Sequence, residues 1–80
     1  MNNVVASLKS RCGRFKADIE RRSSGAFEVI AYRWVEDWDP VRAILEQYWT
    51  EVPGTSSMTD TLDRAEQLAR EKLDLLAGAA

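Results

Sequence analysis

The stretch Ala26-Phe27-Glu28-Val29-Ile30-Ala31-Tyr32-Arg33-Trp34-Val35-Glu36 decides the fold of this chain. β-Branched and aromatic residues dominate it, which predicts a β-strand over 26–36. With the two-residue period of a strand, its apolar side chains fall on both faces: Phe27, Val29, Ala31 and Val35 on one, and Ile30, Tyr32, Trp34 and then Trp38 on the other. A strand of this kind is typically central and covered on both sides.

The residues before this strand predict a hairpin partner. Over 14–22, apolar Phe15, Ala17 and Ile19 alternate with charged residues, which is the pattern of a half-buried strand. Ser23-Ser24-Gly25 then gives a turn signal, with glycine available for a left-handed conformation. We therefore expect an antiparallel hairpin over 14–36.

Two registers of this hairpin remain open. A three-residue loop would pair Ile19 with Val29 and Lys16 with Tyr32, whereas a four-residue loop would pair Ile19 with Ile30. We favour the three-residue loop because it places the apolar residues of both strands on one face.

A helix is expected at each end of the chain. Residues 3–12 carry an N-cap residue in Asn3, apolar residues at helical spacing, and Gly13 where a terminating glycine is common. Residues 59–77 carry a longer apolar stripe, with Ser57 or Thr59 as the N-cap and Gly78 at the end. The stripe consists of Leu62, Ala65, Leu68, Ala69, Leu73 and Leu76.

The segment 37–52 fits two structures. Asp39-Pro40 is a good helix start, and residues 41, 44, 45 and 48 are apolar at helical spacing. Residues 48–52 before Pro53-Gly54 are instead typical of the end of a strand. We expect a turn or one helical turn over 39–45 and a strand over 46–52, because a lone two-stranded hairpin is only marginally stable.

The expected fold class is therefore α+β, in a single small domain over 1–80. It consists of a short N-terminal helix, an antiparallel hairpin extended to a three-stranded sheet, and a C-terminal amphipathic helix packed on one face. No apolar run approaches the roughly 20 residues of a membrane span, and the N-terminus lacks the pattern of a signal peptide. These features predict a cytoplasmic protein without a membrane partner.

The composition excludes several kinds of chemistry. The chain has no histidine, so the commonest general base and the Ser-His and Cys-His nucleophile pairs are missing. Cys12 is the only cysteine, so no disulfide and no cysteine-based zinc site can form within the chain. We interpret Cys12 as a small buried apolar residue and Glu36, Asp37 and Asp39 as a solvated acidic loop. No catalytic residue, metal or cofactor is predicted.

The aromatic residues carry the functional prediction. Both faces of the predicted central strand are apolar, and the helices of so small a chain cannot easily cover both. The uncovered apolar face is a surface that a second copy or another protein would cover. We expect a non-catalytic protein-interaction module that self-associates as a homodimer. The predicted contact residues are Tyr32, Trp34, Trp38 and Trp49, with Arg14, Lys16 and Arg33 at the rim.

Two alternatives follow from the charge distribution. Residues 1–22 hold six basic and two acidic side chains, so the basic 9–22 segment with the sheet aromatics could bind nucleic acid. The acidic residues of 36–39 and 60–74 could instead make the chain an adaptor or inhibitor that docks on a basic protein.

Overall fold

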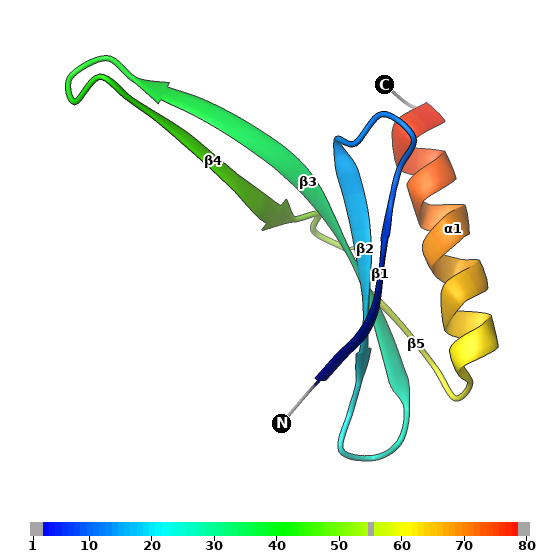
Figure 1. Ribbon diagram of the computed structural model, residues 1–80. Coiled ribbons are helices and arrows are strands. Elements are labelled where there is room, and N and C mark those ends of the chain that lie inside the picture. The colour runs from blue at the N-terminus through cyan, green and yellow to red at the C-terminus, as the bar shows by residue number, and fades with distance from the viewer. Residues whose placement is uncertain (1–2, 55, 79–80) are drawn as a thin grey trace.

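The computed structural model describes residues 3–54 and 56–78, which form an antiparallel sheet and one helix (Figure 1). The elements in chain order are β1 (Asn3–Lys9), β2 (Phe15–Arg21), β3 (Phe27–Asp39), β4 (Ile44–Glu51), β5 (Ser57–Thr59) and α1 (Leu62–Gly78). The strands pair in the order β1-β2-β3-β4, and β5 also pairs with β3. The fold is α+β, as predicted, but its sheet is larger than the expected three strands.

The long central strand β3 organises the sheet. One edge of its first half pairs with β2 from Phe27 to Arg33, and its second half pairs with β4 on the other edge. β5 continues along the same edge as β4, because Val29 pairs with Ser57 after the β4 ladder ends at the bond from the Val52 N–H to the Ala31 carbonyl (2.9 Å). The turn at Gly54, with φ of 74°, interrupts what is otherwise one continuous partner strand.

The predicted N-terminal helix over 3–12 is wrong, because this segment forms strand β1. A register shift between Val4 and Ala6 marks a β-bulge there. Val4 and Val5 are adjacent apolar residues that break the two-residue alternation of a strand and imitate a helical pattern, and the bulge lies at this point. Gly13 has φ of 73° in the β1–β2 turn, so its left-handed conformation serves a hairpin instead of a helix end.

The predicted β2–β3 hairpin is confirmed, in the favoured register. Ile19 pairs with Val29 and Lys16 pairs with Tyr32. The three-residue loop is closed by a bond from the Arg22 N–H to the Ala26 carbonyl (2.8 Å). Gly25 adopts φ of 90° in this loop, which is the left-handed conformation that three-residue hairpins require.

The remaining elements differ from the predictions mainly at their boundaries. The expected strand over 46–52 begins earlier, at Ile44, after a turn. Helix α1 begins at Leu62 instead of residue 59, since residues 57–59 form β5. Its N-cap is therefore Thr61, whose Oγ1 accepts a hydrogen bond from the Arg64 N–H (3.2 Å), and neither Ser57 nor Thr59 has that role.

Helix α1 packs on one face of the sheet, and the core lies between them. The fully or almost fully buried side chains there are Ala17, Ile19, Val29, Ala65, Ala69 and Leu73. Three of these six are alanines, so the helix can approach the strands closely. Partly buried Phe15 and Phe27 pack at the margin of this core.

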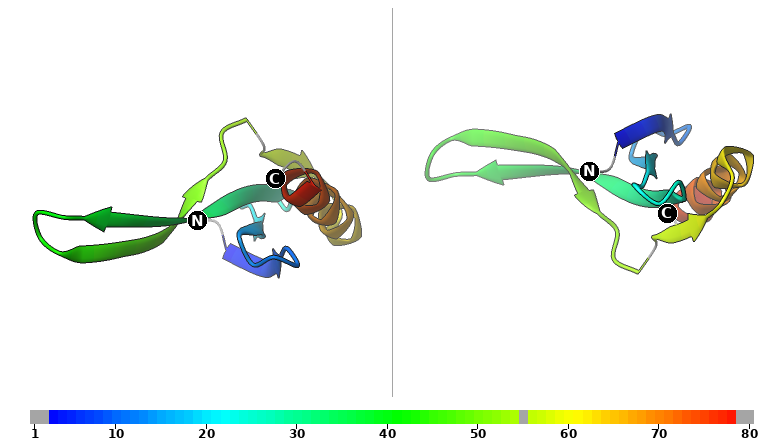
Figure 2. Two further views of the ribbon diagram at one scale, coloured as in Figure 1. Left: turned by 90° about the horizontal axis from the view of Figure 1, so that it is seen from above. Right: turned by 90° about the horizontal axis from the view of Figure 1, so that it is seen from below.

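The helix covers only part of the sheet. Among the described residues α1 contacts β1, β2, β3 and β5 and makes no contact with β4. We call these contacting elements, with β3 only as far as Arg33, the body. We call Trp34–Glu51 the arm, a two-stranded ribbon that projects from the body and lies at the opposite end of the molecule from α1 (Figures 1 and 2).

Candidate interaction surface

The predicted aromatic contact residues lie on one face of the sheet, the face opposite α1. We call it the open face. Side-chain alternation and the pairing register place Tyr32, Trp34 and Trp38 of β3 there. Lys16 pairs with Tyr32, and Trp49 pairs with Trp34, so these two residues share the same face.

The two predicted arginines are placed differently. The Arg14 carbonyl accepts a hydrogen bond from the Trp34 N–H (2.7 Å), so Arg14 lies directly beside the aromatic residues. Arg33 pairs with Phe15, and alternation assigns it to the face that carries the helix. The structure therefore brings six of the seven predicted residues to one face and leaves Arg33 on the other.

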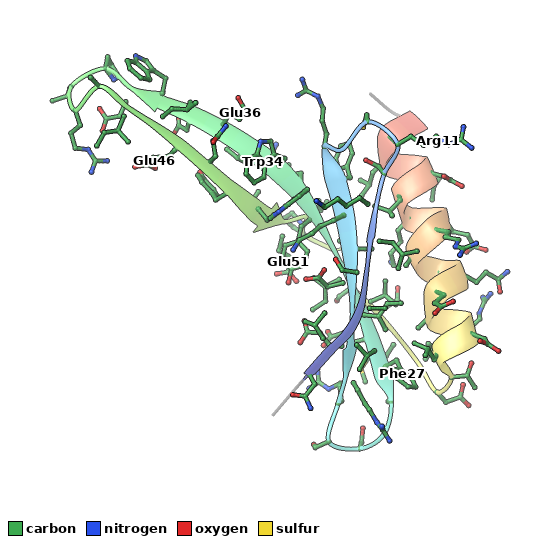
Figure 3. All side chains as sticks on the ribbon, viewed as in Figure 1. Arg11, Phe27, Trp34, Glu36, Glu46 and Glu51 are labelled. Carbon is green, nitrogen blue, oxygen red and sulfur yellow. The ribbon has the colours of Figure 1, made fainter. Side chains whose placement is uncertain are left out.

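The aromatic residues nearest the body form a packed cluster. The Trp34 and Trp49 rings meet edge to face, with centroids 5.2 Å apart. The Lys16 ammonium lies 5.1 Å from the ring centroids of both Tyr32 and Trp49, which is a double cation–π contact. The Trp34 indole N–H donates to Glu36 Oε1 (3.0 Å), and both side chains lie on β3 in the arm (Figure 3). This cluster anchors the arm to the body.

A buried carboxylate supports this cluster from the body. Asp18 is only 9% exposed; it accepts a hydrogen bond from Ser7 Oγ (2.7 Å) and lies 3.4 Å from the Lys16 ammonium. Burial, followed by the negative charges of Asp18 and Glu20, raises the pKa of the Tyr32 phenol. The neutral form of the phenol is thereby favoured further, and the Lys16 ammonium is held between the Asp18 carboxylate and the Tyr32 and Trp49 rings.

The outer part of the arm exposes large apolar side chains. The exposed fractions are 57% for Trp38, 92% for Val41, 46% for Ile44, 49% for Leu45 and 44% for Tyr48. No second layer packs behind these residues in the described chain, because α1 does not reach β4. Exposed apolar residues gathered on one element are characteristic of interaction sites.

Sequence reasoning missed four of these arm residues as contact residues. Positions 41, 44, 45 and 48 have helical spacing, so they were consistent with the buried stripe of a helix. The signal that identifies them is strand pairing: β4 pairs with β3 in the register that places Leu45 opposite Trp38. The sequence does not fix the register of the predicted strand over 46–52. The exposed apolar residues of the arm therefore could not be assigned to a contact surface.

The tip of the arm is held by one carboxylate. Asp39 Oδ1 accepts hydrogen bonds from the Val41 N–H (3.0 Å) and the Arg42 N–H (3.3 Å), and Oδ2 accepts one from Arg42 Nε (2.7 Å). These bonds, the Arg42 side chain first, lower the pKa of Asp39. Arg42 also reaches Glu46 (2.9 Å), and Ala43 completes the turn with φ of 52°. The tip therefore has a defined shape that presents Val41 to solvent.

The charged segments behind the two alternative functions are divided by the fold. Lys9, Arg11, Arg14 and Lys16 gather near the β1–β2 turn, whereas Arg21 and Arg22 lie at the other end of the hairpin. Arg22 is bound to Glu28 there (2.6 Å). The acidic residues of 36–39 lie on the arm, while those of 60–74 lie mainly on α1 at the opposite end of the molecule. Neither segment forms one continuous charged surface.

The charges of the open face nearly balance. It carries Lys9, Arg14, Lys16 and Arg22 together with Asp18, Glu20, Glu28, Glu36 and Glu51. Lys16 and Arg22 pair with Asp18 and Glu28, so Glu20, Glu36 and Glu51 have no basic partner among the described residues. These three carboxylates would oppose phosphate binding to their part of the face through charge repulsion.

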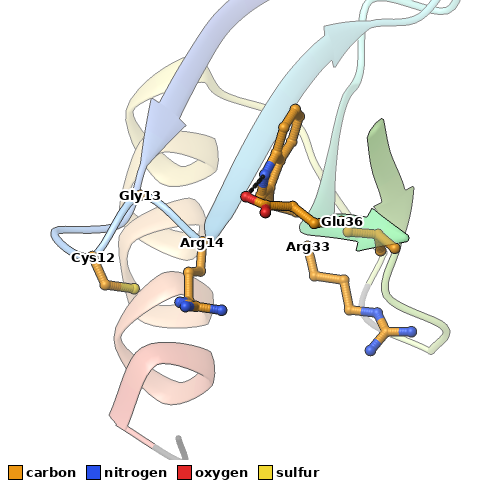
Figure 4. Close-up of a pocket in the computed structure, with 7 residues that line it drawn as sticks. Cys12, Gly13, Arg14, Arg33 and Glu36 are labelled. Atoms are coloured by element: carbon orange, nitrogen blue, oxygen red, sulfur yellow. Dashed lines mark hydrogen bonds between the residues drawn. The ribbon is translucent and has the colours of Figure 1, made fainter. Parts of the chain in front are cut away.

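A pocket of about 530 Å³ lies where the β1–β2 turn meets the base of the arm (Figure 4). It is lined by Cys12, Gly13, Arg14, Arg33, Trp34, Val35 and Glu36. The prediction that Cys12 is buried is wrong, since its thiol is exposed. Ser10 Oγ lies 3.3 Å from the sulfur. This hydrogen bond makes the largest contribution to the lowered pKa of Cys12.

No cluster of three or more histidine, cysteine or acidic side chains suited to a metal ion occurs in residues 3–54 and 56–78. Within the same residues, no helix is long and apolar enough to cross a membrane. Comparison with protein-family models, curated proteins and solved structures finds no match to this chain. The case for function therefore depends on the geometry of the open face and the arm.

Proposed function

We propose that this protein is a non-catalytic protein-interaction module that self-associates through its arm. The observation that carries the proposal is the exposure of Trp38, Leu45 and Tyr48 on a ribbon that no helix covers in the described chain. Burial of an apolar side chain is worth about 25 cal/mol per Å², so covering these rings and branched chains favours association. The proposed rim residues are Arg14 and Lys16, beside the aromatic cluster, and Arg33, on the opposite face of the sheet.

The arm suits binding because its inner end is rigid and its outer end is exposed. The Trp34–Trp49 pair and the Lys16 contacts fix the base of the ribbon, and Asp39 fixes its tip. A preorganised contact surface loses less conformational entropy when it binds. The exposed residues between the two ends are therefore preorganised for binding a partner.

Sedimentation velocity across the micromolar range tests this proposal. The wild-type chain is expected to show concentration-dependent association. Leu45→Ser should weaken it by about tenfold or more, corresponding to about 1.4 kcal/mol. Leu75→Ser is the control, because Leu75 is an even more exposed leucine (75%, against 49% for Leu45) that lies on α1, away from the arm. A wild-type chain that stays monomeric, or equal weakening by both variants, contradicts the proposal.

A second candidate function is binding of a nucleic acid at the β1–β2 turn. The observation that favours it is that Arg14 and Arg33 line the same pocket. Neither guanidinium forms an ion pair with a described residue. Binding of a mixed-sequence single-stranded RNA at about 50 mM salt tests it, because electrostatic contacts are strong there. The Arg14→Ala/Arg33→Ala variant should bind more weakly, Arg70→Ala should not, and absence of binding by the wild type contradicts it.

A further inference from the structure

The outer edge of β4 is an open sheet edge within the described chain. β4 is the last strand of the sheet order, and its only partner strand is β3. The Val52 N–H points to β3, so the backbone groups of alternate residues point the other way. Leu45, Gln47, Trp49 and Glu51 therefore direct their N–H and C=O groups outward. An edge of this length is a template for another strand.

We infer that the strand on this edge is β4 of a second copy, paired antiparallel about a two-fold axis at Gln47. This inference rests on the proposed function and specifies how the two arms meet. In a two-fold antiparallel pair the residue numbers of directly opposed residues have a constant sum. Gln47 then faces Gln47 of the second copy, and Trp49 faces Leu45 of the second copy.

This register builds two apolar rows across the interface. Within one copy, Trp34 pairs with Trp49 and Trp38 pairs with Leu45. Placing Trp49 opposite Leu45 of the second copy joins these pairs, so each row contains four apolar side chains on one face. Cross-strand pairs of aromatic and aliphatic residues are the favourable contacts of antiparallel sheets.

The neighbouring registers are less favourable. An axis at Glu46 places the two Glu46 carboxylates opposite each other, and like charges in that position are destabilising. An axis at Tyr48 places Trp49 opposite Gln47 and Leu45 opposite Glu51. The axis at Gln47 avoids both, since it places Glu46 opposite Tyr48 and Glu51 opposite Ala43 of the second copy. The paired segment is then residues 44–50 of each copy, because Ala43 lies outside β4 in the turn, with φ of 52°.

Charge also favours this edge over stacking of two open faces. A two-fold stack would take the unpaired Glu20, Glu36 and Glu51 of both copies out of water. Desolvating carboxylates without basic partners is costly. Edge pairing leaves these groups in water and adds main-chain hydrogen bonds, so the open edge and the apolar rows are used together.

Disulfide trapping tests the register in the full chain with Cys12→Ser. Gln47→Cys should give a covalent dimer with oxidised glutathione, because directly opposed residues of a hydrogen-bonded pair have Cα atoms about 5.5 Å apart, within the disulfide range. Leu45→Cys should give several-fold less, because residue 45 does not face itself. A mixture of Ile44→Cys and Thr50→Cys should form the mixed dimer, because these positions face each other.

Gln47→Pro separates edge pairing from face stacking. The Gln47 N–H points away from β3, so proline removes an interface donor without removing a bond of the β3–β4 ladder. Self-association should weaken at least about tenfold, a change of about 1.4 kcal/mol, while near-ultraviolet circular dichroism of the Trp34–Trp49 pair is retained. Undiminished self-association of Gln47→Pro would contradict pairing through the outer edge of β4.

The outcomes distinguish this inference from the function on which it rests. A wild-type dimer that Gln47→Cys does not trap preferentially contradicts the Gln47 register and leaves self-association in place. A wild-type chain that sediments as a monomer at every concentration contradicts both.

Discussion

The two halves of β3 have the same alternating pattern but opposite surroundings. In the body, Val29 is fully buried under α1, whereas on the same face of the arm Tyr48, the pairing partner of Val35, is 44% exposed. Both halves have a strand partner on at least one edge, so pairing alone does not decide burial. The difference is the helix, which ends over the body and leaves the arm without a second layer. The comparison indicates that buried side chains in the body stabilise the fold, whereas the arm exposes apolar side chains to solvent.

The largest expected effect compares an isoleucine in each region. Ile19→Ala removes a fully buried side chain from the body and should lower the free energy of unfolding by about 2–5 kcal/mol. Ile44→Ala removes a side chain that is 46% exposed in the arm and should cost about 0.5 kcal/mol or less, as is usual for surface positions. Urea unfolding at concentrations where the chain is monomeric measures both.

Ile19→Val provides the control if Ile19→Ala fails to fold. It removes one methyl group and should cost about 0.5–1.5 kcal/mol. Equal losses for Ile19→Ala and Ile44→Ala would show that the arm is as tightly packed as the body, against the division drawn between the two regions.

An intermediate effect is expected from the charged side chains. Asp18→Ala in the body leaves Ser7 and Lys16 without their buried acceptor and should cost about 1–3 kcal/mol. Arg42→Ala in the arm removes contacts to Asp39 and Glu46 that are exposed to water, so its effect on unfolding should be much smaller. Thermal and urea unfolding of the two variants check this order.

A Ser7→Ala/Asp18→Ala cycle sharpens the result. Because the Ser7 hydroxyl donates to Asp18, the losses of the two single variants should not add. Additive losses would indicate that this hydrogen bond does not stabilise the body.

Within the body, the β2–β3 hairpin and helix α1 were predicted from the sequence and β1 was not, for physical reasons. The β2–β3 hairpin was predicted with its register because Phe15, Ala17 and Ile19 alternate without interruption and Gly25 fits only a tight loop. Helix α1 was predicted because its apolar stripe faces a single layer. At the N-terminus, the bulge at Val4–Ala6 disturbed the alternation and produced a false helix.

The candidate site was only partly predictable. The aromatic residues on one face of β3 follow from alternation, which correctly grouped Tyr32, Trp34 and Trp38. The exposure of Leu45 and Tyr48 does not follow from alternation. Positions 41, 44, 45 and 48 also fit the period of a helix, although they lie in the arm. The exposure of Tyr48 depends on where α1 ends relative to β4, and that of Leu45 on the lack of a layer over the open face, so both are properties of the assembled fold.

The smallest expected effect concerns pH at the tip of the arm. Hydrogen bonds from Arg42 lower the pKa of Asp39 in the folded arm below its ordinary value of about 3.9. The resulting stabilisation of the turn is complete above that ordinary value and is lost as pH falls through the folded pKa. Amide chemical shifts of Val41 and Arg42 should therefore titrate together, with a midpoint below about 3.9.

Arg42→Gln identifies the cause of this shift. The Arg42 side chain is the largest contribution to the lowered pKa of Asp39, so its removal should move the midpoint upward. The Ile19 amide in the body provides the internal reference, since Ile19 lies far from the tip in the pairing order and should not follow this titration. An unchanged midpoint in Arg42→Gln would mean that the backbone N–H groups alone hold Asp39. The tip would then keep its shape without any charge pair, and its exposed Val41 would be positioned by the turn itself.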